Sequence, residues 1–80
     1  MIIFTQQKDF AVNMDHVVAY GITEDNGVSV VFDNGKSCTI GEFEDAVTAK
    51  KVLRQIINSC DLGQRIYFVP QNQEVRDGTF

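Results

Sequence analysis

The chain has 80 residues, 44 % of them hydrophobic and 22 % charged, and carries a net charge of −4 at pH 7. This size allows one domain, and the composition excludes the low hydrophobicity and high charge of a disordered chain. No run of about 20 apolar residues is present, which predicts no membrane span. The negative charge argues against nucleic acid as a partner, and the start has no secretory signal, so we expect a cytoplasmic protein.

Two short β-prone runs occupy the start of the chain, at 2–5 and 10–12, with a polar turn between them. The sequence leaves open whether they join the main sheet.

Three longer β-prone runs follow, at 17–23, 28–32 and 36–40. They are separated by Asn-Gly pairs at 26–27 and 34–35. Asn-Gly between two strands favours a type I′ turn, which needs positive φ at both central residues. The pattern therefore predicts an antiparallel meander of three strands.

The periodicity then becomes helical between residues 46 and 60. Asp45 is the expected N-cap, and Gly63 suits the left-handed position just beyond the helix end. The stripe expected to face the sheet consists of Ala46, Ala49, Leu53, Ile56, Ile57 and Cys60.

A last β-prone run spans residues 65–69, and Pro70 closes it because proline cannot donate to a ladder. The polar residues 71–80 are expected to form a flexible tail, in which Val75 and Phe80 are the side chains able to dock. The sequence thus predicts one domain over residues 1–70.

These elements predict an α+β fold, in which a small antiparallel sheet is covered on one face by a single amphipathic helix. The alternation within the strands and the helical stripe select the expected core. Its members are Val18, Tyr20, Ile22, Val28, Val30, Phe32, Cys38, Ile40, Leu53, Ile56, Ile57, Ile66 and Phe68.

Apolar side chains are also predicted on the uncovered face of the sheet. They are Val31, Tyr67 and Val69, and they motivate a hypothesis of homodimerisation. The helix carries a small basic patch, which completes the candidate interaction surface with Lys50, Lys51 and Arg54.

Charge is unevenly placed along the chain. Residues 1–45 hold eight acidic and two basic side chains, whereas residues 46–80 hold three acidic and five basic ones. Helix electrostatics accounts for part of this pattern. The other interpretation is a surface with two poles, suited to a charged partner.

Cys38 and Cys60 are the only cysteines and belong to no CxxC motif. Two isolated cysteines without a secretory signal are typical of reduced, intracellular proteins. We expect both to be free and partly buried, with a disulfide between strand and helix as the lesser alternative.

Few residues suggest a catalytic, metal-binding or cofactor-binding site. His16 has Asp15 as neighbour, but adjacent strand residues point to opposite faces, so an exposed histidine is the simpler interpretation. Glu42, Glu44 and Asp45 offer oxygens to a hard cation, yet acids at a helix start explain them better. With one histidine and no glycine-rich phosphate loop, the sequence predicts no catalytic residue, no metal site and no cofactor.

The order of these signals resembles small uncharacterised proteins of low-GC Gram-positive bacteria and their phages or prophages. The matching segments are VNMDHV at 12–17, NG at 34–35, IGEF at 40–43, AKKVLRQI at 49–56 and GQRIYFVP at 63–70. Members usually have Thr or Ser at the position of Asp45. Aspartate caps the N-terminus of a helix as well as these residues do. The resemblance implies the same order of meander, helix and strand, and implies no activity or cofactor.

The main functional hypothesis is a non-enzymatic protein-interaction module of unidentified partner, with an origin in a phage or mobile element. The alternative is a small-molecule or metal-sensing domain, with a pocket between helix and sheet lined by Cys38, Cys60 and Tyr20. A catalyst using Cys38 or His16 is the third and weakest hypothesis.

Overall fold

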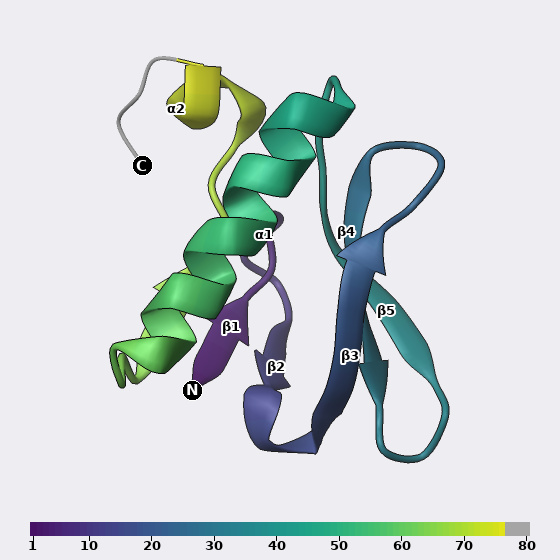
Figure 1. The fold of residues 1–80 in the computed structure, drawn as a ribbon, viewed down its shortest axis with the longest axis vertical. Helices are drawn as coiled ribbons and strands as arrows, with labels where there is room; N and C mark the ends of the chain where they lie inside the picture. Colours follow the sequence, from purple (N-terminus) through teal and green to yellow (C-terminus); the bar gives the residue numbers. More distant parts are fainter. Residues whose placement is uncertain (77–80) are drawn as a thin grey trace.

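The structure is a computed structural model that describes residues 1–76, with side chains up to residue 75. Six strands, two α-helices and one short 3₁₀-helix make up this part of the chain (Figure 1). In chain order they are β1 (Ile2–Phe4), β2 (Ala11–Asn13), η1 (Met14–His16), β3 (Val17–Ile22), β4 (Gly27–Phe32), β5 (Ser37–Glu42), α1 (Ala46–Asp61), β6 (Ile66–Phe68) and α2 (Asn72–Arg76). The predicted α+β class is confirmed.

The strands form two three-stranded sheets rather than one. The meander β3-β4-β5 is antiparallel, as predicted. The second sheet has the order β2-β1-β6, with β2 antiparallel and β6 parallel to β1. The two N-terminal runs therefore do not join the meander but pair with the last strand. In Figure 1, α1 lies across the front of β1, with the meander beside it.

Both hairpin corners lie where the Asn-Gly pairs predict them, but the predicted type I′ turn is wrong. Only one residue per corner has positive φ, namely Asn26 at 62° and Gly35 at 84°. In the first corner, the Thr23 N–H donates to the Gly27 carbonyl at 2.8 Å, which closes a three-residue loop. A left-handed residue in third position is the usual solution for loops of this length.

Each outer strand of the meander contains one extra residue that shifts its register. Val18 is the extra residue in β3, and it is 67 % exposed although its alternation predicted burial. Ile40 is the extra residue in β5 and is buried. Its displaced carbonyl accepts a hydrogen bond from the Gln6 backbone N–H at 2.9 Å, so this bulge links the meander to the other sheet.

The hydrophobic core lies between α1 and the inner faces of both sheets. Four predicted members, Val28, Val30, Ile40 and Ile56, are buried, and four more are partly buried and pack against the core: Ile22, Phe32, Cys38 and Leu53. The remaining buried apolar residues are Ile3, Val12, Phe43, Ala49, Val52, Tyr67, Val69 and Val75.

The buried stripe of α1 is rotated by about one residue from the predicted one. It consists of Ala49, Val52, Ile56 and Ser59, whereas Ile57 is 43 % exposed. Ala46 and Cys60 are exposed as well. The flank with Leu53 and Ile57 is apolar as well, so a stripe displaced toward that flank also fits the helical period.

Strand β6 also buries the face opposite to the predicted one. Ile66 and Phe68, expected in the core, are 51 % and 60 % exposed. Tyr67 and Val69, expected on an uncovered face, are only 7 % and 2 % exposed. Because all four residues are apolar or aromatic, alternation alone does not select the buried face. Tyr20 in β3 is likewise at the surface, at 37 % exposure.

Residues 71–76 differ from the expected flexible tail, because they turn into α2 and pack against the domain. Val75 is buried, so the docking that the sequence allowed for this side chain takes place. The Gln71 amide donates to the Gln6 carbonyl at 2.5 Å, and the Asn72 amide oxygen accepts from the Glu44 N–H at 2.9 Å. Phe80 and the rest of 77–80 lie outside the described residues.

The two predicted signals at the ends of α1 are confirmed. The Asp45 carboxylate accepts from the Thr48 N–H at 2.7 Å. At the other end, Gly63 has a φ of +76°, which suits the left-handed position of a Schellman motif. In that motif the Gln64 N–H donates to the Ser59 carbonyl at 3.0 Å.

The buried amide of Gln6 joins three parts of the chain. Its nitrogen donates to the Glu42 carbonyl at 3.0 Å and to the Pro70 carbonyl at 3.1 Å, and its oxygen accepts from the Glu42 N–H at 2.9 Å. Gly41 lies beside this junction, where an added Cβ would be 2.8 Å from a Val69 methyl group. The turn after β1, the end of β5 and the segment after β6 therefore meet at one point.

We expect Gln6→Leu to lower the free energy of unfolding by about 1–3 kcal/mol, because it leaves partly buried backbone groups of Glu42 and Pro70 without their partner. Gln7→Leu is the matched control, since the neighbouring side chain is exposed. Urea unfolding of the two variants measures the difference. Equal stability of both variants would contradict the role assigned to Gln6.

The pKa of Asp45 is lowered from its ordinary value of 3.8, chiefly by the hydrogen bond from the Thr48 N–H, with the Thr48 hydroxyl and Lys51 adding to the effect. The ionised cap therefore stabilises the fold above about pH 3.8, and this contribution is lost as the pH falls through the lower, folded pKa. Asp45→Asn keeps a capping oxygen without a titrating charge.

We expect wild type to be more stable than Asp45→Asn at neutral pH and this advantage to vanish at acidic pH. Urea unfolding at several pH values measures it. A stability difference that stays constant across the series would refute the assigned pKa direction.

Candidate interaction surface

The sheet β2-β1-β6 has one buried and one exposed face. Val12, Ile3 and Tyr67 stand in one cross-strand row, and all three are buried beneath α1. The alternate residues of the three strands therefore point away from the helix. We call this side the outer face; it comprises Ile2, Phe4, Ala11, Asn13, Ile66 and Phe68.

The outer face is apolar apart from Asn13 and is open to solvent. The rings of Phe4 and Phe68 stack with centroids 5.1 Å apart and an interplanar angle of 12°. Ile2 stands opposite Ile66 in the same register. The β6 members of these pairs are more than half exposed. Two aromatic and two aliphatic side chains thus form a continuous apolar row on two paired strands.

The far edge of β6 is unpaired within the described residues, because β6 is the last strand in the order β2-β1-β6. The Ile2 N–H donates to the Arg65 carbonyl at 2.8 Å, and the Val69 N–H donates to the Phe4 carbonyl at 3.0 Å. Along a strand of a parallel ladder, successive residues direct their N–H and C=O groups to opposite sides of the strand. Arg65 and Val69 bond to β1, so the N–H and C=O groups of Ile66 and Phe68 point away from β1.

Lys50, Lys51 and Arg54 are exposed on α1, where the sequence placed them. Among the described side chains, no salt bridge engages any of the three. Val31 is half-buried on the meander. Of the predicted interaction surface, these four residues are accessible, whereas the assignment of Tyr67 and Val69 to an uncovered face is wrong.

The Tyr67 side chain is instead a support for β6. Its hydroxyl donates to the Gln55 amide oxygen of α1 at 2.5 Å, and burial raises the pKa of this phenol well above its ordinary value. The neutral hydroxyl therefore anchors β6 under the helix and holds Ile66 and Phe68 outward.

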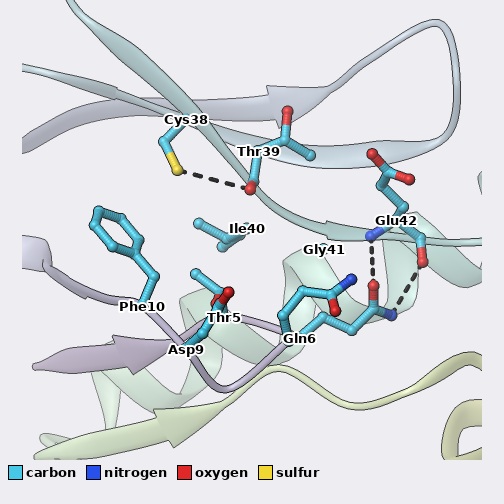
Figure 2. A pocket seen from close by; sticks show the side chains of 10 residues that line it. Thr5, Gln6, Asp9, Phe10, Cys38, Thr39, Ile40, Gly41 and Glu42 are labelled. Carbon is cyan, nitrogen blue, oxygen red and sulfur yellow. Dashed lines mark hydrogen bonds between the residues drawn. The ribbon is translucent and has the colours of Figure 1, made fainter.

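A hollow of about 210 Å³ lies between the β1–β2 turn and β5 (Figure 2). Phe10 and Cys38 face each other across it, and Gln6 closes one end through its bonds to Glu42. Asp9 is 3.5 Å from the Thr5 hydroxyl, a long contact for a hydroxyl donor. The hollow is open and smaller than the roughly 300–1,000 Å³ of ordinary ligand pockets.

A second hollow of about 290 Å³ lies between the start of α1 and α2 and includes Glu44, Asp45 and Lys51 in its lining. Asp45 already serves as the helix cap. The described residues contain no group of three or more His, Cys, Asp or Glu side chains arranged to hold a metal ion.

His16 lies in η1 rather than at a strand start, and the carboxylate that its side chain contacts is not that of Asp15. Its Nδ1 is 3.1 Å from the Asp33 carboxylate in the β4–β5 corner, and both side chains are mostly exposed. No sequence signal indicates this pair, because it depends on how the meander folds back. A solvated pair of this kind fixes a loop weakly.

Both cysteines are free, with Cys38 half-buried and Cys60 exposed. The Cys38 thiol donates to the Thr39 carbonyl at 3.6 Å. The hypothesised sensing pocket between helix and sheet needs Cys38, Cys60 and Tyr20 together. Neither hollow brings them together, since Cys38 lines the first without the other two.

Comparisons with known proteins give no match: no family model, no curated protein and no solved structure is significantly similar to this chain. Within residues 1–76, no helix has the length and apolar character needed to cross a membrane.

We expect the two thiols to react at different rates with a water-soluble disulfide reagent, Cys60 first and Cys38 more slowly, because only Cys60 is exposed. Absorbance of the released thiolate measures both phases, and Cys60→Ser removes the fast one. A faster reaction of Cys38 would contradict the partial burial of its side chain.

Proposed function

We propose that this chain is a non-enzymatic protein-interaction module that binds a protein partner through the outer face and the free edge of β6. The observation that carries the proposal is the exposure of Ile66 and Phe68, at 51 % and 60 %, on a strand whose far edge is unpaired among the described residues. Exposed apolar side chains beside open backbone groups are typical of surfaces that receive another chain.

The contacts that hold the side chains of this surface support the proposal. Phe68 is stacked on Phe4, and Tyr67 is held by Gln55, so the contact side chains are ordered before a partner arrives. A preformed surface loses little conformational entropy on binding, which favours affinity.

The setting of the interaction is part of the same proposal. The resemblance to small proteins of low-GC Gram-positive bacteria and their phages favours a bacterial or phage protein as partner. A sensing role has weaker support, because the hollows are open and do not lie between α1 and a sheet.

Selection from a displayed library of random peptides tests this function even while the natural partner is unidentified. We expect wild type to enrich peptides whose affinity falls about tenfold or more in the double variant Ile66→Thr/Phe68→Thr, because apolar anchors dominate interface energies. Threonine keeps the preference for a strand. Binding is measured by fluorescence anisotropy.

Val18→Thr is the matched control, since Val18 is 67 % exposed but lies on the other sheet. Circular dichroism confirms that each variant is folded. Enriched peptides that bind the double variant as tightly as wild type, or a selection that enriches none, would refute the proposal.

A further inference from the structure

We infer that the partner segment is an extended strand that adds to the edge of β6 and in which apolar residues alternate with acidic ones. This inference rests on the function proposed above and names the chemistry of the partner. Backbone geometry, the parity of side chains along a strand and the charges beside β6 carry it.

The backbone of β6 provides the site for strand addition. Ile66 and Phe68 present their N–H and C=O groups to the open edge, while Arg65 and Val69 direct theirs to β1. A segment in extended conformation satisfies the open groups by continuing the sheet as a fourth strand. The opposite edge at β2 is less suitable, because its outer-face residues are Ala11 and Asn13.

The side chains of the added strand alternate between the two faces of the sheet. Every second residue of this strand falls on the outer face, next to Ile66 and Phe68, where it completes the apolar row. These positions therefore call for β-branched or aromatic side chains, which make the favourable cross-strand pairs.

The other residues of the added strand face the flank of α1. Because Tyr67 reaches Gln55, this flank borders the edge of β6. Lys51 lies one helical turn from Gln55 on the same side. Arg65 precedes β6 and has the same parity as Tyr67. Both cations are exposed, and neither makes a salt bridge among the described side chains, although Lys51 lies near enough to Asp45 to help lower the pKa of that carboxyl group. Acidic residues on this face of the partner complement them.

The same charges argue against a second copy of the chain as occupant. Two β6 strands paired antiparallel about Tyr67 would place Arg65 of one copy beside Val69 of the other. Strand β6 runs opposite to α1, since α2 lies at the start of that helix (Figure 1). Arg65 would thus approach Lys51 of the other copy, and like charges there disfavour the dimer.

The probe is a synthetic peptide, acetylated and amidated, in which glutamate alternates with isoleucine and phenylalanine. Amide shifts of ¹⁵N-labelled protein report its binding. We expect shifts centred on residues 65–69 and an affinity about tenfold or more above that of the same peptide with lysine in place of glutamate. Added salt should reduce this preference.

N-methylated peptides and charge-reversed variants of the protein distinguish pairing at the strand edge from nonspecific electrostatic attraction. N-methylation of the apolar peptide residues blocks an antiparallel addition, and N-methylation of the glutamates blocks a parallel one, so we expect only one set to abolish binding. Lys51→Glu/Arg65→Glu should reverse the charge preference. Lys8→Glu/Lys36→Glu, with the same change in net charge elsewhere, should preserve it.

The inference is overturned if both methylated peptides bind alike or if the lysine peptide binds as well as the glutamate peptide. Self-association abolished by Ile66→Thr/Phe68→Thr would also overturn it, by identifying a second copy as the occupant. Selected peptides that need Ile66 and Phe68 but lack acidic residues would overturn this inference alone and leave the interaction module standing.

Discussion

The position of β6 depends on the junction at the Gln6 amide. This side chain holds the end of β5 and the carbonyl of Pro70 against the turn that follows β1. A domain of 80 residues with two three-stranded sheets has little core to hold them together. Directional hydrogen bonds at a buried point therefore set the relative position of the sheets. Because Pro70 directly follows Val69, the same junction places the last strand.

Strand β1 links this constraint to the proposed surface. It shares its hydrogen bonds between β2 and β6, and its inner residue Ile3 is fully buried. The parallel pair β1–β6 needs a long crossover, which the meander and α1 supply. With α1 on one side of the sheet, no element of residues 1–76 covers the other side over Phe4 and Phe68. The topology thus produces both the open face and the open edge.

Local signals were readable in the sequence, whereas choices of face and partner strand were not. The cap at Asp45, the left-handed Gly63 and the two hairpin corners each depend on a few adjacent residues. The buried face of β6 depends on which sheet it joins, and its apolar run carries no alternation to decide this. The extra residue Val18 in β3 shifted the register without any glycine or proline to indicate it. The contact of His16 with Asp33 depends on the folded meander.

The residues that flank β6 are of the kinds that disfavour pairing between two copies of an open apolar strand. The strand is three residues long, Arg65 precedes it and Pro70 follows Val69. Short edges, cations and prolines are the devices by which natural sheets discourage edge-to-edge association. In the proposed mode of binding Arg65 has a second effect, because a cation at this edge repels the same edge of another copy and attracts an acidic strand. Discrimination by repulsion needs no additional contact area, which suits a domain of this size.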